Sequence, residues 1–198
     1  LAKEAGVPIE SDISLFFRYC PFPIYSITGT RGKSTTTALL GEMLKYKHPK
    51  TVVAGNITRS PLEDLDWLLE ESTPVPIVLE LSSWLLESLE GLGLGPQIAV
   101  LTNAYKDHLD RYPSFEAYVA AKELIFQEQK PAQFAVLNAD QEIMREIAGR
   151  IVSKHVHWFS AGALPDGADG VYRVGGDFVR RIGGQETRYA HVHDLKLE

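Results

Sequence analysis

The feature that most constrains the fold is a short apolar segment that runs into glycines and then hydroxyl residues, IYSITGTRGKSTTT at 24–37. A strand, a glycine turn and a helix in this order form a phosphate cradle, because glycines let an anion approach the backbone and the helix N-terminus presents N–H groups to it. Lys33 adds a positive charge, and Ser34 stands where such loops hold Mg²⁺. The motif is shorter than G-x-x-x-x-G-K-[ST], since Ile27 replaces the first glycine. A plain glycine turn with a surface lysine is the alternative.

Composition narrows the class of protein. With 198 residues, 44% of them hydrophobic and 23% charged, the chain can form one substantial globular α/β domain. A net charge of −6 argues against binding to nucleic acid or to a membrane surface, which are both polyanionic. The single cysteine, Cys20, excludes an internal disulfide and is typical of a reducing compartment, so we expect a cytoplasmic location. No apolar run reaches the length of a membrane span.

Short apolar segments alternate with helical ones, which predicts an α/β fold of the phosphate-binding-loop type, with a mostly parallel sheet covered by helices on both faces. We expect a lead-in segment with a helix at 1–21 and an α/β core at 22–156. The further expected strands are 51–54, 76–81, 97–102 and 134–137, and the further expected helices are 62–71, 84–89, 114–129 and a segment ending near 148. In the helix at 62–71, the leucines expected in the core are Leu62, Leu65, Leu68 and Leu69.

The C-terminal part, 157–198, has a different character. Its short alternating segments are separated by glycine pairs and show no helical rhythm. We expect a small antiparallel appendage there, with hairpin turns at 175–176 and 183–184.

Polar residues follow four of the expected parallel strands, and ligands bind beyond the carboxyl ends of the strands in such sheets. These ends carry the phosphate loop, Asn56, the pair Glu80 and Ser82, and a polar loop that runs from Asn103 to His108. Glu80 ends an apolar strand, where a carboxylate is costly to bury unless it meets a cation. Mg²⁺ shared with Ser34 is the natural partner, and a pairing with lysine is the alternative. A histidine such as His108, taken alone, is more often a surface residue, and it becomes a candidate here because of its position after a buried strand.

Taken together, five motifs resemble the Mur ligases, the ATP-dependent amide-forming enzymes of peptidoglycan synthesis. The motifs are GTRGKST at 29–35, GNI at 55–57, ELSS at 80–83, DHLDRY at 107–112 and AAK at 120–122. The resemblance extends over about 9–197 and is greatest to the members that add D-glutamate. It implies a role in cell wall synthesis, and hence in cell shape and division.

The resemblance also implies roles for individual residues. Nucleotide binding falls to Gly29, Thr30, Arg31, Gly32, Lys33, Ser34 and Thr35. Two Mg²⁺ ions are implied, one held by Ser34 and Glu80, the other by His108 and by Lys122 in the form of a carbamate. Asn56, Ser82 and His108 are expected to approach the substrate, and Lys33, His108 and Lys122 to be catalytic. A plain lysine on a helix surface is the alternative for Lys122.

The implied reaction joins D-glutamate to UDP-N-acetylmuramoyl-L-alanine at the expense of ATP. The substrate carboxylate attacks the γ-phosphate to give an acyl phosphate, which the amine then converts to an amide. Because this family places a UDP-binding domain before such a region and an amino-acid-binding domain after it, we expect 1–198 to be the central ATP-binding domain, monomeric and inactive alone. The alternatives are another Mur-type or folylpolyglutamate-type ligase, and a non-catalytic nucleotide-binding module. The last is disfavoured because the sequence has no base-reading N-K-x-D motif.

Overall fold

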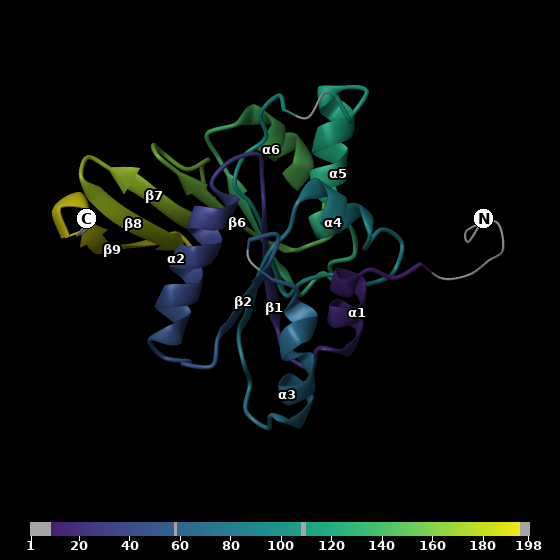
Figure 1. Ribbon diagram of the computed structural model, residues 1–198. Helices are drawn as coiled ribbons and strands as arrows, with labels where there is room; N and C mark the ends of the chain where they lie inside the picture. The colour runs from purple at the N-terminus through teal and green to yellow at the C-terminus, as the bar shows by residue number, and fades with distance from the viewer. Residues whose placement is uncertain (1–8, 58, 108–109, 195–198) are drawn as a thin grey trace.

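The computed structural model describes residues 9–57, 59–107 and 110–194, which form one nine-stranded sheet with helices packed on it (Figure 1). The strand order is β2-β3-β1-β4-β5-β6-β7-β8-β9. The strands are β1 (Ile24–Thr28), β2 (Val52–Gly55), β3 (Ile77–Glu80), β4 (Ile98–Leu101), β5 (Phe134–Asn138), β6 (His155–Ser160), β7 (Gly170–Val174), β8 (Asp177–Ile182) and β9 (Gln185–His191). The helices are α1 (Asp12–Tyr19), α2 (Lys33–Lys45), α3 (Leu65–Glu70), α4 (Ser83–Glu87), α5 (Phe115–Gln127) and α6 (Glu142–Ala148), with 3₁₀ turns η1 (Pro61–Asp64) and η2 (Val192–Asp194).

The centre of the sheet is parallel, as predicted. β1 lies between β3 and β4 and pairs in parallel with both. The register places Glu80 beside Ile27 on one side and beside Gly55 on the other, while Thr28 pairs with Leu101. The carboxyl ends of β1 to β4 therefore meet at one edge of the sheet, and the loops that follow these strands converge there.

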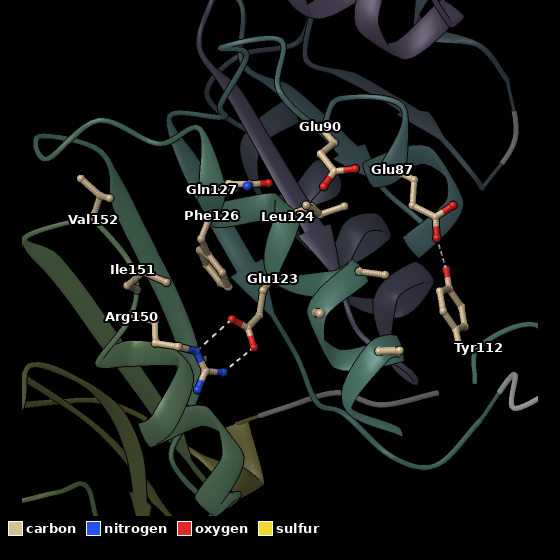
Figure 2. Close-up of a pocket in the computed structure, with 13 residues that line it drawn as sticks. Glu87, Glu90, Tyr112, Glu123, Leu124, Phe126, Gln127, Arg150, Ile151 and Val152 are labelled. Atoms are coloured by element: carbon tan, nitrogen blue, oxygen red, sulfur yellow. Dashed lines mark hydrogen bonds and ion pairs between the residues drawn. The ribbon is translucent and has the colours of Figure 1, made fainter. Parts of the chain in front are cut away.

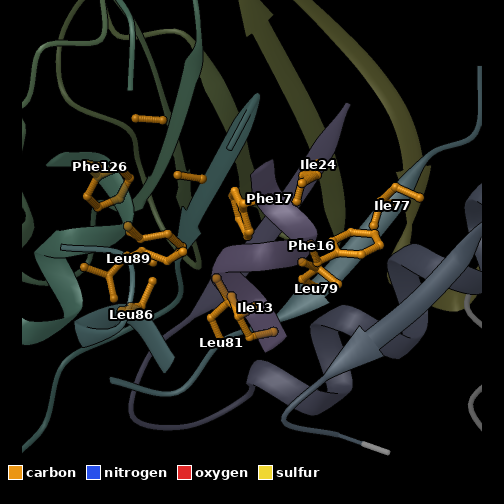
Figure 3. Close-up of a cluster of buried hydrophobic side chains, with 14 of the residues drawn as sticks. Ile13, Phe16, Phe17, Ile24, Ile77, Leu79, Leu81, Leu86, Leu89 and Phe126 are labelled. Atoms are coloured by element: carbon orange, nitrogen blue, oxygen red, sulfur yellow. The ribbon is translucent and has the colours of Figure 1, made fainter. Parts of the chain in front are cut away.

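The two faces of the sheet are covered differently. On one face, alternate strand residues such as Leu79 and Leu101 join side chains of α1, α3, α4, α5 and α6 in a single buried cluster, part of which is drawn in Figure 3. The opposite face carries α2, which packs on β1, β2 and β3. Gly41 of α2 allows this close approach, because a Cβ there would lie 2.4 Å from Val53 Cγ2. None of the described helices is both long and apolar enough to cross a membrane.

Local signals in the sequence explain where the helices begin. Ser11 caps α1, with its Oγ accepting the N–H of Ser14 at 3.0 Å, and Ser114 caps α5 in the same way. One core prediction was wrong. Leu69 is 56% exposed while Leu68 is fully buried, because α3 is only six residues long and consecutive residues on a helix point in directions about 100° apart.

The C-terminal strands continue the main sheet. β6 pairs in parallel with β5, and β7 pairs in parallel with β6, so the expected change of character at residue 157 falls inside a parallel strand. The antiparallel arrangement is confirmed for β7, β8 and β9, and both glycine pairs form the expected hairpin turns. β6 runs parallel to β5 because α6, between them, carries the chain back across the sheet. The tight turns after β7 and β8 can only reverse the chain, so the strands that they join are antiparallel.

We expect Gly41→Ala to destabilise the protein by about 1–3 kcal/mol, although alanine is usually the better residue inside a helix. The added methyl group collides with Val53. Urea unfolding of the single variant, of Val53→Ala and of the double variant measures the effect. When Val53→Ala is already present, adding Gly41→Ala is expected to leave the free energy of unfolding unchanged or to raise it. A stabilising Gly41→Ala in the unaltered chain would contradict this packing.

Candidate nucleotide-binding site

The loop between β1 and α2 has the geometry of a phosphate cradle. Gly32 precedes the helix with a left-handed backbone, at φ +78°. The backbone N–H of Thr36 donates to Gly32 O at 2.9 Å. The N–H groups of Lys33, Ser34 and Thr35 therefore have no acceptor inside the helix and face the loop end. This end also carries the positive end of the helix dipole, so an anion is stabilised there.

Lys33 lies across the loop. Its Nζ donates to Gly29 O at 2.9 Å and to Thr30 O at 3.2 Å, which holds the ammonium group at the mouth of the cradle. Lys33 thus contacts the backbone of the glycine loop, and its role in nucleotide binding stays a prediction.

The loop is fastened to the segment that follows β4. Thr30 N–H donates to Asn103 O at 3.0 Å, and Arg31 N–H donates to Asn103 Oδ1 at 2.8 Å. Thr102 Oγ1 donates to Arg31 O at 2.7 Å. A side chain on Gly29 would destroy this contact, since a Cβ there would lie 2.0 Å from Thr102 Oγ1. The sequence marked the loop after β4 as polar but assigned Asn103 no role, because its only signal was its place after a strand.

Glu80 is 2% exposed and ends β3 on the sheet face that α2 covers. Its Oε1 accepts a hydrogen bond from Asn56 Nδ2 at 3.2 Å, while its Oε2 has no hydrogen-bond partner among the described residues. The alternative, an ion pair with a lysine, does not occur in the described part of the chain. A buried carboxylate with a bare oxygen fits a cation.

The residues near Glu80 suit Mg²⁺ better than a metal that needs a full protein cage. Within the ranges that the structure describes, no three His, Cys, Asp or Glu side chains come together as metal ligands. Mg²⁺ is commonly held by one or two carboxylates together with phosphate oxygens and water. Glu80 and the Ser34 hydroxyl, in the first turn of the facing helix, match that pattern.

Lys122 reaches the loop from the opposite face of the sheet. It is 2% exposed, so the alternative of a surface lysine was wrong. Its Nζ donates to Gly29 O at 3.0 Å and lies 4.3 Å from the ring centre of Tyr118. Burial, together with the charge of Lys33, lowers the pKa of Lys122 to about 7, and Asp107 opposes this shift. Much of this amine is therefore neutral near neutral pH.

The remaining predicted residues have mixed positions. Ser82 caps α4, with its Oγ accepting the N–H of Leu85 at 3.3 Å, and Arg31 and Thr35 are exposed at the loop. His108 lies outside the described residues, so its metal-binding, substrate-binding and catalytic roles stay predictions.

A cavity of about 580 Å³ opens beside the loop, between α2 and the face of β4, β5 and β6 that the other helices do not cover. Its volume is in the range of small-molecule sites. Its lining includes Arg31, Gly32, Leu40, Val100, Val136 and Phe159.

A second cavity, of about 650 Å³, lies between α4, α5 and the segment after α6 and is shown in Figure 2. None of the predicted site residues lines it. Several of its charged groups are already paired, Glu123 with Arg150 and Glu87 with Tyr112. The loop end of the sheet is therefore the candidate site.

A strand, a glycine loop with its lysine, and a buried carboxylate at the carboxyl edge of a parallel sheet define an α/β domain of the phosphate-loop class. The family model of the Mur ligase middle domain matches residues 27–173, and the chain belongs to this family.

Two curated relatives carry the name UDP-N-acetylmuramoylalanine–D-glutamate ligase. The one from Roseiflexus sp. (strain RS-1) is 46% identical over 168 residues, which cover 83% of this chain and 35% of the relative. The one from Symbiobacterium thermophilum is 37% identical over 196 residues, which cover 99% of this chain and 42% of the relative. The chain thus spans less than half the length of these relatives.

Solved structures show the same fold. MurF ligase from Thermotoga maritima in complex with ADP has a TM-score of 0.59 at 20% identity, over 91% of this chain and 44% of its own. The UDP-N-acetylmuramate:L-alanyl-gamma-D-glutamyl-meso-diaminopimelate ligase from Neisseria meningitides has a TM-score of 0.63 at 18% identity, over 93% of this chain and 60% of its own.

We expect the stability of the protein to rise with pH above 7 because of Lys122. Its pKa is about 7 when folded, against 10.5 ordinarily. Between these values the unfolded chain binds more protons, so the folded state gains stability as the pH rises, by an amount on the order of a few kcal/mol. Below pH 7 both states are protonated and the full penalty applies.

Denaturant unfolding at pH 6 to 10, in buffer free of carbon dioxide, measures this effect. At pH 7 and below, Lys122→Met is expected to have a higher free energy of unfolding than the unaltered chain. This difference is expected to shrink as the pH rises. Lys130→Met, which replaces an exposed lysine, serves as the control and is expected to show a flat difference. A flat difference for Lys122→Met as well would show that the amine is not desolvated.

Proposed function

We propose that this chain is the ATP- and Mg²⁺-binding domain of a ligase that joins D-glutamate to UDP-N-acetylmuramoyl-L-alanine. The observation that carries the proposal is the convergence of Lys33 and Lys122, from opposite faces of the sheet, on the carbonyl oxygen of Gly29. The Lys33 ammonium group beside a helix N-terminus suits a polyanionic ligand, and the buried Lys122 amine stands at the same carbonyl oxygen. The names of the curated relatives support the choice of substrates.

The proposed reaction has two steps. The carboxylate of the nucleotide-sugar substrate attacks the γ-phosphorus of ATP, the bond to the β-phosphate oxygen breaks, and ADP leaves. The amine of D-glutamate then attacks the acyl carbon, loses a proton and expels inorganic phosphate. Both steps move negative charge between oxygens, so positioning and electrostatic stabilisation are the main tasks of the protein.

The residues of this chain divide these tasks. The N–H groups of Lys33, Ser34 and Thr35 bind phosphate oxygens, and the Lys33 ammonium group turns from the loop carbonyls to the transferred phosphate. Glu80 and Ser34 hold Mg²⁺, with Asn56 fixing the carboxylate from the side. When bound, Mg²⁺ offsets negative charge on the phosphates. His108 is proposed to bind a second ion and the substrate, and Ser82 to face the nucleotide-sugar.

We further propose that Lys122 acts as a carbamate. Its neutral amine attacks carbon dioxide, a C–N bond forms, and one proton is released, so that a buried cation becomes an anion with two oxygens. Burial beside Lys33 favours this change, because it removes the repulsion between two like charges. The low pKa supplies the neutral amine that the addition needs. We expect the whole ligase to act as a cytoplasmic monomer, with UDP-binding and amino-acid-binding domains flanking this one.

Lys33→Ala is expected to abolish Mg²⁺-dependent ATP binding while leaving the fold intact, because it removes the charge at the mouth of the cradle. Titration calorimetry on the 198-residue chain measures the affinity, and circular dichroism checks the fold. Lys45→Ala, at the exposed end of the same helix, is the matched control and is expected to bind like the unaltered chain. Equal ATP affinity in the Lys33 variant would refute the cradle assignment.

Lys122→Ala is expected to lower the activity of the ligase that contains this chain by at least tenfold, with partial rescue by short-chain carboxylates that replace the carbamate oxygens. D-Glutamate-dependent release of phosphate is the assay. Lys130→Ala is the control and is expected to be unaffected. Full activity without a rescue agent would exclude a carbamate, and stimulation by an amino acid other than D-glutamate would favour a different member of the family.

A further inference from the structure

We propose that Asn103 is a positioning residue that holds the phosphate-binding loop ready for its ligand; this rests on the proposed nucleotide-binding function. Asn103 follows β4, and nothing in its sequence position assigns it a task. Its side chain nevertheless makes two hydrogen bonds to the backbone of the loop.

The carboxamide of Asn103 pairs with both backbone groups of one loop residue. Its Oδ1 accepts the N–H of Arg31 at 2.8 Å, and its Nδ2 donates to the C=O of Arg31 at 2.9 Å. The backbone C=O of Asn103 also accepts the N–H of Thr30, at 3.0 Å. A planar group with a donor and an acceptor side by side is needed for this, so aspartate loses one bond and leucine loses both.

We call this pairing of the Asn103 carboxamide with the backbone of Arg31 the clamp. Two further carboxamides hold the residues next to Asn103. Gln141 repeats the pattern on Ala104, with Oε1 accepting the N–H at 2.9 Å and Nε2 donating to the C=O at 3.1 Å. Asn138 Nδ2 donates to Thr102 O at 3.0 Å. The residues on both sides of Asn103 are thus held by the last residue of β5 and by the segment that follows it. Side-chain amides thus join the phosphate loop to residues 102–104, and these residues to Asn138 and Gln141.

The clamp decides which N–H groups are left for a ligand. Those of Thr30 and Arg31 are used by Asn103, and the N–H groups that remain for an anion include those of Lys33, Ser34 and Thr35. The clamp also fixes the loop before any ligand arrives. Without it, the exposed backbone of Arg31 bonds to water and samples other conformations, and this freedom has to be lost on binding.

Both lysines contact the loop that Asn103 holds, Lys33 at Gly29 and Thr30 and Lys122 at Gly29. Thr30 Oγ1 accepts the N–H of Tyr105 at 3.0 Å, so the connection that leads to α5 is attached to the loop at a second point. Lys122 projects from α5 onto Gly29. Asn103 holds Thr30 and Arg31 of the loop that leads to Lys33, and Lys122 contacts the same loop at Gly29. We therefore expect the loss of Asn103 to affect the use of ATP more than the stability of the fold.

The test compares Asn103→Ala and Asn103→Asp with Gln133→Ala. Gln133 is a carboxamide that also bonds backbone groups, those of Gly95 and Lys130, but precedes β5 at the opposite end of the sheet. Calorimetry on the 198-residue chain gives the Kd of ATP with Mg²⁺, thermal melting gives Tm, and hydrogen exchange follows the amides of Thr30 and Arg31. In the ligase that contains this chain, the KM for ATP and for D-glutamate are measured separately.

We expect both Asn103 variants to raise the Kd and the KM for ATP about tenfold, the equivalent of one to two lost hydrogen bonds. The KM for D-glutamate and the Tm should stay close to those of the Gln133 control, and the Thr30 and Arg31 amides should exchange faster. An unchanged Kd for ATP in Asn103→Ala overturns the proposal, as does an equal rise in both KM values. If Asn103→Ala fails to fold, Gln141→Ala, with faster exchange at Arg31 and weaker ATP binding, decides in its place.

Failure of the proposed function gives a different result. An unaltered chain that does not bind ATP removes the nucleotide-binding role, whatever the variants do. Faster exchange of the Thr30 and Arg31 amides in Asn103→Ala still supports the clamp in that case, and unchanged exchange overturns it.

Discussion

The carbonyl oxygen of Gly29 is the point on which the site depends. It accepts hydrogen bonds from Lys33 and from Lys122, which arrive from helices on opposite faces of the sheet. This is possible only because β1 is central and parallel to both neighbours, so that its carboxyl end is open to both faces. It also requires glycine, since a side chain would overlap Thr102. Strand order, helix placement and residue type therefore converge on one atom.

Two like charges at one acceptor repel each other, and the two lysines differ in how far they are exposed to water. Lys33 is half-buried and keeps contact with water, whereas Lys122 is buried among the aromatic and apolar side chains of α5. Desolvation falls on Lys122, which is why its pKa is lowered to about 7. An anion at the loop, or a negative charge placed on Lys122 itself, offsets the repulsion. The site without ligand is thus biased towards anion binding.

The sequence allowed the central fold to be predicted and the main candidate site residues to be singled out, because each left a local signal. Alternating apolar segments gave the parallel strands, and Glu80 stood out as a charge ending an apolar strand. Other features left no such signal. Whether β6 runs parallel depends on how α6 crosses the sheet, and which leucines of α3 are buried depends on where that short helix ends. Asn103 and Gln141 bond to backbone groups, which every residue type carries, so no pattern of letters could reveal their partners.

This last point bears on how such a loop achieves affinity. A glycine-rich segment is mobile, and glycine loses more conformational freedom on ordering than any other residue. A phosphate loop built from glycines needs its order supplied from outside. Here the order comes from the neighbouring β4–α5 connection, through bonds made before a ligand is present. The free energy of phosphate binding then does not have to be spent on ordering the loop, and more of it remains for holding the transferred group in place.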